Sequence, residues 1–592
     1  MKIVLAAVNA KYIHSNLAVY SLKAYAKTFA SEIEIAEYTI NQQTDDILMD
    51  LYKRQPDMLC FSCYIWNLRY VEELIKEIHK ILPETILWAG GPEVSYDSRN
   101  VLERLPELTG VMKGEGEKTF FELLNCYHCK EKTQDDLGDI TGITFRRIDG
   151  TIVENEWREI MDLSEVPFVY EDMTLFENKI IYYESSRGCP FRCSYCLSSV
   201  DKCLRFRNLD LVRKELQFFL DAKVPQVKFV DRTFNCRHEH SMAVWSYIKE
   251  HDNGVTNFHF EISADLLNEE EIALIRSMRP GLIQLEIGVQ STNPETIREI
   301  RRTMKFEEVA RIVRELNENK NVHQHLDLIA GLPFEDYESF GKSFDDVYAL
   351  QPEQLQLGFL KVLKGSHMEE AKAKYGLVYK NEPPYEVLYT KWLPYADVLK
   401  LKGIEEMVEV YYNSGQFQYT LKALEREFSS AFQMYESLAV FYEQHRLHQM
   451  SHSRVTRYEI LLDFVKQICP DKEDFYKELL TFDLYLRENA KTRPDFAGES
   501  LVTKEWLQEF YDREAKEPVC LRGYTGYDKR QMRKMTHVEK FTRASENICG
   551  KEEPVYVLFD YQDRNPLDHQ AACYFLQNDG KRYKIPSLTV IR

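Results

Sequence analysis

The residues with the clearest chemical potential are three closely spaced cysteines. Cys189, Cys193 and Cys196 follow the spacing C-x3-C-x2-C and come directly after an apolar run, Lys179-Ile180-Ile181-Tyr182-Tyr183, that is typical of a strand. Thiolate sulfur is a soft ligand that suits iron-sulfur centres. Three thiolates can hold three irons of a cubane cluster, and the fourth iron then stays open. The spacing therefore predicts a [4Fe-4S] site on a loop that leaves a strand.

Two other interpretations of these cysteines are possible. A zinc site would need a fourth close ligand, and the nearest candidates, Cys203 and His238, lie outside the usual paired spacing. Buried thiols without a chemical role are common in a reduced cytosol. Gly188 and Pro190 mark a junction between strand and loop at the cysteines, which argues against buried structural thiols.

Size and composition limit the function classes. A chain of 592 residues with 44% hydrophobic residues should form three or four domains. No stretch approaches the ~20 apolar residues of a membrane span, and the first residues lack a cleavable signal, so we expect a cytoplasmic protein. The odd count of 13 cysteines favours a reducing compartment. The net charge of -19 favours a small-molecule substrate over nucleic acid.

The elements that position the cysteines begin with an amino-terminal α/β pattern. Strand-like runs at 2–8, 33–36, 58–62, 85–89 and 110–112 alternate with amphipathic helices. This order predicts a doubly wound, Rossmann-like parallel sheet whose ligands bind at the carboxyl ends of the strands. No G-x-G-x-x-G follows the first strand, so the nicotinamide fingerprint is absent.

Glycine-rich turns follow the fourth and fifth predicted strands. They are Gly90-Gly91-Pro92 and Gly114-Glu115-Gly116-Glu117. Glycine lacks a side chain and accepts positive φ, so such turns let the backbone approach a flat ligand closely. Taken alone, each stretch is more often an ordinary turn, so the glycines by themselves leave an ordinary turn and a cofactor site both open.

A second series of strands surrounds and follows the cysteines. Six strand-helix units predict a partial (β/α)6 barrel of the TIM type, whose chemistry lies at the carboxyl ends of its strands. Asp231 follows the second of these strands and Glu261 ends the third. Both carboxylates are therefore candidates for direct roles in catalysis.

The cysteine spacing, with the aromatic Tyr195 before the last cysteine, resembles the radical S-adenosylmethionine (SAM) superfamily. The resemblance implies that the open iron chelates SAM and that reductive cleavage gives a 5'-deoxyadenosyl radical. It also implies that Tyr195, Gln290, Ser291 and Gly331 bind SAM. The turn after the second strand departs from the Gly-Gly-Glu-like turn of many family members.

The amino-terminal region resembles the cobalamin-binding domain of the B12-dependent branch of that superfamily. The resemblance implies that the two glycine-rich turns contact cobalamin. His14 lies where many corrinoid proteins carry D-x-H-x-x-G with an axial histidine, although Tyr12 and Leu17 replace the Asp and Gly. Ligation by His14 and a packing role beneath the corrin are both open.

These patterns predict four regions. They are a cobalamin domain at 1–130, a connector with a hairpin near Asp149-Gly150 at 131–172, a radical SAM core at 173–378, and a mainly helical extension with late strands at 379–592.

The predicted function is cobalamin-dependent methyl transfer to an unactivated carbon of an unknown substrate. Cyclisation or rearrangement with the same cofactors, methylthiolation of RNA, and a non-catalytic corrinoid or redox sensor are the alternatives. The resemblance also implies an electron donor such as flavodoxin or ferredoxin. We expect no membrane partner.

Overall fold

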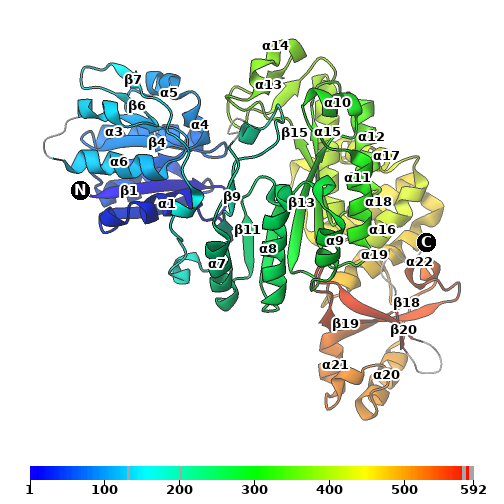
Figure 1. Ribbon diagram of the computed structural model, residues 1–592. Helices are drawn as coiled ribbons and strands as arrows, with labels where there is room; N and C mark the ends of the chain where they lie inside the picture. Colours follow the sequence, from blue (N-terminus) through cyan, green and yellow to red (C-terminus); the bar gives the residue numbers. More distant parts are fainter. Residues whose placement is uncertain (130–133, 200–202, 577–581, 586–592) are drawn as a thin grey trace. The chain divides into compact units, whose positions relative to one another are not determined.

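The computed structural model describes residues 1–129, 134–199, 203–576 and 582–585 (Figure 1). Residues 131–133, at the start of the predicted connector, lie outside this part. The chain divides into two compact units, the first made of residues 1–322, 329–337 and 359–395, and the second of 323–328, 338–358 and 396–592. Within the described residues, no helix is both long and apolar enough to cross a bilayer.

A seven-stranded sheet forms the amino-terminal part of the first unit, in the order β2-β1-β3-β4-β5-β6-β7. The predicted parallel strands are confirmed as β1 (Ile3–Asn9), β2 (Ile33–Thr39), β3 (Met58–Ser62), β4 (Ile86–Gly90) and β5 (Gly110–Met112). Alternate residues of β1 enter the cores on opposite faces of the sheet. A strand buried on both faces is therefore apolar throughout.

Helices cover both faces of this sheet (Figure 1). α2 (Thr44–Arg54), α3 (Leu68–Ile81) and α5 (Ser98–Arg104) pack on one face, and α1 (Leu17–Tyr25) and α6 (Glu117–His128) pack on the other. In α3, the residues at helical spacing that the sequence places on one face, Val71, Leu74, Ile75 and Ile78, are buried.

The hairpin expected in the connector has a larger structural role than predicted. Its strands, β6 (Ile143–Arg146) and β7 (Ile152–Glu154), turn at Gly150 with φ of 86°. β6 pairs antiparallel with β5, so the hairpin extends the amino-terminal sheet. The Asp-Gly turn is visible in sequence. The pairing partner is not, because backbone hydrogen bonds between strands do not depend on residue type.

The six predicted barrel strands are confirmed, in the order β15-β14-β13-β12-β11-β8. They are β8 (Ile181–Tyr183), β11 (Gln226–Phe229), β12 (Asn257–Ile262), β13 (Ile283–Gln290), β14 (His323–Ala330) and β15 (Gln354–Phe359).

One face of this sheet carries the core that α8 (His238–Glu250) covers. Phe260 on β12 lies 4.5 Å from Phe229 on β11 and 4.4 Å from Phe234, between ring centroids. Trp245 on α8 lies 5.3 Å from Phe234. The aromatic side chains therefore point towards α8. The polar side chains that alternate with them along the strands point to the opposite face of the sheet.

Most of the carboxy-terminal region predicted at 379–592, mainly helical with late strands, lies in the second unit, which takes in residues 396–592. Its helices include α16 (Gln418–Leu424), α17 (Ala431–Gln444), α18 (Arg454–Ile468), α19 (Glu473–Arg487) and α20 (Lys504–Lys516). A four-stranded antiparallel sheet follows, with β18 (Thr536–Phe541), β19 (Val555–Arg564), β20 (Ala571–Leu576) and β21 (Arg582–Lys584). The apolar run that predicts a strand at 555–559 lies in β19.

Candidate functional site

The two ends of the cysteine loop lie close together. β9 (Ser186–Arg187) and β10 (Arg205–Phe206) pair antiparallel on either side of it. Between them, Gly188 has a φ of 93°, and a Cβ added there would lie 2.6 Å from the Cys203 carbonyl oxygen. Only glycine fits this approach, so its position next to Cys189 reflects the closure of the loop.

Backbone hydrogen bonds on both sides hold the centre of the loop. The Ser194 N–H donates to the Ile300 carbonyl at 2.9 Å, and the Met368 N–H donates to the Ser194 carbonyl at 2.9 Å. Within the loop, the Cys196 N–H donates to the Cys193 carbonyl at 3.2 Å. The loop is therefore anchored to segments about 100 and 170 residues further along the chain.

The predicted catalytic carboxylate Asp231 lies in the interior, with 0% of its surface exposed. It accepts hydrogen bonds from the Ser185 N–H at 3.0 Å, the Ser185 hydroxyl at 2.7 Å and the Ser186 hydroxyl at 2.5 Å. Burial raises the pKa of Asp231 to about 6, although these hydrogen bonds act in the opposite direction. Asp231 therefore fixes the turn that leads into the cysteine loop, and its role in catalysis stays a prediction.

The surroundings of the cysteines fit an iron-sulfur cluster with SAM. Three buried polar atoms at this end of the barrel, Ser194 Oγ, Gln290 Oε1 and Arg302 Nε, have no hydrogen-bond partner among the described residues. Buried polar atoms are rarely left unsatisfied, so they indicate a polar group that occupies this space. No group of three His, Cys, Asp or Glu side chains in the described residues could hold a single metal ion. A cubane cluster makes a different demand, since each thiolate binds a different iron.

The sequence predicted a role for Gln290 but not for Arg302. Gln290, predicted to bind SAM, ends β13 with a φ of 72°, and its amide fills the space beside Gly288. Arg302 was missed, because it follows β13 by 12 residues in an ordinary charged segment. Its guanidinium donates to the Gly288 carbonyl, and Nη1 lies 3.5 Å from the Tyr195 hydroxyl and 3.8 Å from Cys193 Sγ. Tyr195, also predicted to bind SAM, therefore lies beside this cation.

The other two predicted SAM contacts have clear structural partners. The buried Ser291 hydroxyl donates to Glu335 at 2.6 Å and accepts from the Asn293 N–H at 3.0 Å. Gly331 has a φ of 88°, and a Cβ there would lie 2.8 Å from the Val387 side chain. These contacts explain both residue types without a ligand.

The two glycine-rich turns of the amino-terminal sheet lie next to each other. Gly91 has a φ of 115°, and a Cβ there would lie 2.5 Å from the Cys63 carbonyl oxygen. Pro92 begins α4 (Pro92–Ser95), and the Cys63 N–H donates to the Gly90 carbonyl at 2.7 Å. The Ser95 hydroxyl donates to the Gly91 carbonyl at 2.8 Å and accepts from the Gly114 N–H at 3.1 Å, which ties the two turns together.

The acidic residues of the second turn contact the strand before the cysteines. Arg187 donates to Glu115 at 3.0 Å, to Glu117 at 2.8 Å and to Glu184 at 2.7 Å. Arg205 also donates to Glu115. Burial alone would raise the pKa of Glu117, but the Arg187 guanidinium more than offsets this, so the pKa lies below its usual range. Sequence reasoning assigned these arginines no role, because the pairing joins residues 70 to 90 positions apart.

Gly116, the other glycine of the second turn, packs closely against α1. A Cβ on Gly116 would lie 2.9 Å from the Leu22 side chain of α1. The turn therefore lies between the Leu22 side chain and Arg187, and a larger residue at position 116 would require the end of the Leu22 side chain to move.

His14 joins the sheet to the first barrel strand. Its Nδ1 lies 2.6 Å from the Tyr182 hydroxyl on β8, and the Ile180 N–H donates to the Ile13 carbonyl at 2.8 Å. Burial lowers the pKa of His14, so the imidazole is neutral at pH 7. Only the tautomer in which Nδ1–H donates to the Tyr182 hydroxyl leaves Nε2 able to bind a metal, so ligation and packing both stay open for His14.

The face of the barrel sheet away from α8 carries a charged network. Glu286 Oε2 accepts from Lys228 Nζ at 3.2 Å and lies 3.0 Å from His259 Nε2. Glu261, predicted to act in catalysis, points to the same face because it alternates with the buried Phe260 and Ile262. Interiors of full α/β barrels are filled by branched apolar side chains, so this polar face is better suited to a ligand than to a packed core.

The charged network could have been predicted from β13 itself. Its sequence, Ile-Gln-Leu-Glu-Ile-Gly-Val-Gln, alternates apolar and polar residues strictly, and the buried pattern follows the same alternation. In a parallel strand this alternation indicates one polar, accessible face. Lys228 and His259 alternate in the same way on their own strands.

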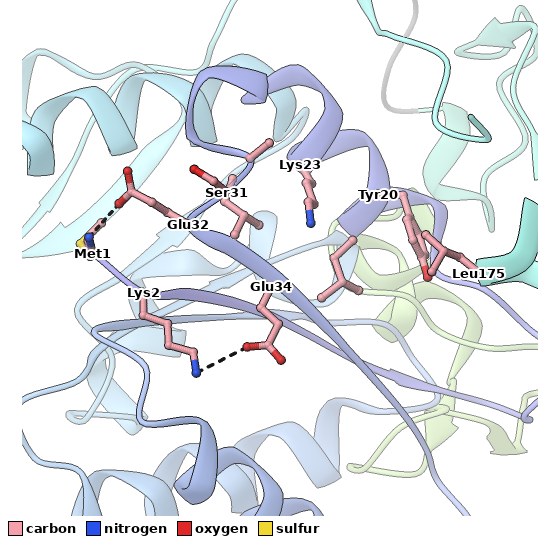
Figure 2. A pocket seen from close by; sticks show the side chains of 11 residues that line it. Met1, Lys2, Tyr20, Lys23, Ser31, Glu32, Glu34 and Leu175 are labelled. Atoms are coloured by element: carbon pink, nitrogen blue, oxygen red, sulfur yellow. Dashed lines mark hydrogen bonds and ion pairs between the residues drawn. The ribbon is translucent and has the colours of Figure 1, made fainter. Parts of the chain in front are cut away.

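A separate surface hollow of about 790 Å³ lies along β2 (Figure 2). It is lined by charged residues that include Lys2, Lys23, Glu32 and Glu34, and Lys2 and Glu34 form an ion pair at 3.6 Å. None of the predicted site residues lines it. It is distinct from the cysteine loop and from the two glycine-rich turns.

Family models match three parts of the chain. Residues 3–124 match the B12 binding domain, residues 183–347 match the radical SAM superfamily, and residues 373–559 match a protein family of unknown function, DUF4080. The first two matches cover the glycine-rich turns and the cysteine loop.

Curated relatives are similar to somewhat less than half of the chain. The cobalamin-dependent radical SAM methyltransferase TokK of Streptomyces tokunonensis is 24% identical, over 48% of this chain and 44% of the relative. Hopanoid C-3 methylase of Methylococcus capsulatus is 25% identical, over 44% and 50%. Anaerobic magnesium-protoporphyrin IX monomethyl ester cyclase of Synechocystis sp. is 26% identical, over 40% and 48%. The chain spans about half the length of these relatives.

Solved structures share the fold. The cobalamin-dependent SAM radical enzyme OxsB with aqua-cobalamin bound has a TM-score of 0.57 at 15% identity, covering 83% of this chain and 82% of that chain. The radical SAM methyltransferase TsrM from Kitasatospora setae, with cobalamin and a [4Fe-4S] cluster bound, has a TM-score of 0.52 at 18% identity, covering 65% and 82%. The chain therefore combines a B12-binding domain at residues 3–124, a radical SAM domain at 183–347 and a DUF4080 region at 373–559.

Proposed function

We propose that this protein is a cobalamin-dependent radical SAM enzyme that transfers a methyl group to an unactivated carbon of a small molecule. The observation that carries the proposal is the contact between the B12-binding domain and the cysteine loop. Arg187, two residues before Cys189, is held by Glu115 and Glu117 from the second glycine-rich turn. Two cofactors bound at these two places would lie against the same buried ion-pair cluster. Relatives named as methyltransferases support methyl transfer.

In this proposal, different residues of the chain would bind the cluster, SAM and the substrate. Cys189, Cys193 and Cys196 would hold the cluster, and the unsatisfied amide of Gln290 would bind SAM. Bound together, the cofactors supply the radical chemistry and carry the methyl group, while the protein supplies orientation and exclusion of water. The polar barrel face around Lys228 would orient the substrate. A flavodoxin or ferredoxin would deliver electrons to the cysteine loop.

A second candidate is cyclisation or rearrangement with the same cofactors. It is supported by relatives named as magnesium-protoporphyrin IX monomethyl ester cyclases, at 26% identity over 40% of this chain and 22% over 27%. Both candidates would use the same cysteines and glycine-rich turns. They differ in what becomes of the methyl group of SAM.

The test is product analysis on the full-length protein. After anaerobic loading with iron, sulfide and hydroxocobalamin, the protein receives SAM and a strong reductant, and chromatography quantifies 5'-deoxyadenosine and S-adenosylhomocysteine. Methyl transfer predicts both products. 5'-Deoxyadenosine alone, with cobalamin bound, would contradict methyl transfer and favour the second candidate.

A matched pair of variants connects the products to the motif. Cys193→Ala removes a predicted cluster ligand, whereas Cys203→Ala removes an exposed cysteine at the base of the same loop. We expect Cys193→Ala to abolish 5'-deoxyadenosine formation and to retain cobalamin binding. Cys203→Ala should behave as the wild type. Equal loss in both variants would mean that the loop, and not the ligand set, was disturbed.

A further inference from the structure

We propose that Arg302 is a positioning residue that hydrogen-bonds the Cys193 sulfur and raises the reduction potential of the cluster. The inference rests on the proposed function only in requiring a [4Fe-4S] cluster at the three cysteines. It assigns a role to a residue outside the cysteine motif.

The local fold fixes the position of Arg302. It follows α10 (Pro294–Glu299), where Arg301 takes a φ of 59° and the Arg302 N–H donates to the Ile297 carbonyl at 3.0 Å. Ile300 accepts the hydrogen bond from Ser194 in the same turn. The segment that carries Arg302 is therefore attached directly to the residue between Cys193 and Tyr195.

The guanidinium reaches the sulfur from an anchored position. Nη2 donates to the Gly288 carbonyl on β13, and Nη1 lies 3.8 Å from Cys193 Sγ and 3.5 Å from the Tyr195 hydroxyl. These acceptors are a carbonyl, a sulfur and a phenol. In the described residues no carboxylate lies within ion-pair distance of Arg302, and the Asp265 carboxylate acts on it only from further away, so the groups in direct contact with the guanidinium are those of the cysteine loop and β13.

The positive charge of Arg302 affects how readily the cluster is reduced. Reduction of the cluster takes one electron from an external one-electron donor and adds one negative charge, with no bond made or broken. A fixed cation beside a ligating sulfur stabilises the reduced state more than the oxidised state. Hydrogen bonds to the sulfurs and the local net charge are two determinants of iron-sulfur potentials. Arg302 should therefore make the cluster easier to reduce.

Of the three cysteines, Cys193 is the one at which the charge of Arg302 is least screened by water. Its side chain is 6% exposed, whereas Cys189 and Cys196 are more exposed to solvent. Water screens a charge near an exposed thiolate more strongly than a charge near a buried one. The arginine thus contacts the sulfur at which its charge acts most effectively.

The experiment measures the potential of the loaded full-length protein without SAM or substrate, by an EPR-monitored redox titration. Arg302→Gln and Arg302→Met remove the charge, and Arg302→Lys retains it. Arg301→Gln is the matched control, because this neighbouring arginine donates to His367 and does not contact a cysteine. Iron content is measured for every variant.

We expect Arg302→Gln and Arg302→Met to shift the midpoint potential to more negative values at unchanged iron content. Arg302→Lys should lie between them and the wild type, and Arg301→Gln should match the wild type. A wild-type potential in Arg302→Gln, together with weaker SAM binding, would overturn the inference and make Arg302 a SAM contact. Failure of both charge-removing variants to load iron would also overturn it, because Arg302 would then be needed for assembly.

The outcome is independent of methyl transfer. A wild-type protein that binds no [4Fe-4S] cluster would defeat the proposed function itself. A wild-type protein that binds the cluster, with variants of unchanged potential, would defeat only the role of Arg302.

Discussion

At the scale of single residues, the cysteine loop depends on buried polar groups that precede it in the fold. Asp231 gathers three donors from Ser185 and Ser186 and so holds the turn two residues before Gly188. A carboxylate without exposed surface is costly when ionised. The site therefore includes a destabilising charge, and this charge has a measurable signature in the pH dependence of stability.

The raised pKa of Asp231 determines whether stability rises or falls with pH. Burial raises its pKa from 3.8 to about 6, so between these pH values the folded state binds a proton that the unfolded state has released. Stability from this group is highest below the unfolded pKa and falls as pH rises to about 6, by roughly 2 to 3 kcal/mol. Asp231→Asn stays neutral and should remove this loss.

Urea unfolding of wild type and Asp231→Asn at pH 4.5 and 6.5 measures the effect. The variant should gain stability relative to the wild type as pH rises, whatever constant offset the amide introduces. A difference between the two proteins that does not change with pH would show that Asp231 is ionised throughout.

At the scale of elements, the glycine-rich turns are shaped by close backbone approach. Gly91 combines a φ of 115° with a Cβ position 2.5 Å from the Cys63 carbonyl, and backbone atoms cannot yield as a flexible side chain can. The turn after β4 therefore requires glycine for the fold, before any cofactor is considered. Gly150 also has a positive φ, of 86°, but open space around its Cβ position.

These two glycines give a matched prediction. Gly150→Ala should cost about 1 kcal/mol, because only backbone strain is added. Gly91→Ala should cost several times more and should reduce cobalamin retention after gel filtration, because β3 and β4 must separate at the turn. Urea unfolding and the visible absorbance of bound cobalamin check the two expectations. Equal costs for the two variants would contradict the close approach at Gly91.

The elements also show what sequence can and cannot predict. Strands β1 to β5 and the six barrel strands were predictable, because each is a short apolar or strictly alternating run. The cysteine ligands were predictable from their spacing. Arg187 and Arg302 were not, because their roles arise from contacts 70 and 109 residues apart in the chain. The roles of Glu115 and Glu117 as partners of Arg187 were hidden for the same reason.

At the scale of the molecule, the B12-binding domain and the radical SAM domain are joined within the first unit by partly buried ion pairs. Arg187 contacts Glu115, Glu117 and Glu184, and Glu117 is only 5% exposed. Removing one member of a buried ion pair leaves an uncompensated charge and typically costs 3–5 kcal/mol. The junction is therefore sensitive to one residue.

Arg187→Met should destabilise the first unit by about 3 kcal/mol and lower the content of both cofactors after reconstitution. Arg192→Met is the control, because Arg192 is exposed on the same loop. Unfolding free energy and cofactor content should be unchanged in the control. Retention of wild-type cofactor content in Arg187→Met would show that the two domains bind their cofactors independently.

We expect one chain to bind both a cubane cluster and cobalamin. The test is metal and cobalamin analysis of the 592-residue protein after anaerobic reconstitution. The expected result is about four irons and one cobalamin per chain, with loss of the iron alone in Cys193→Ala. Uptake of iron without cobalamin would overturn this expectation, because residues 3–124 would then bind a different ligand.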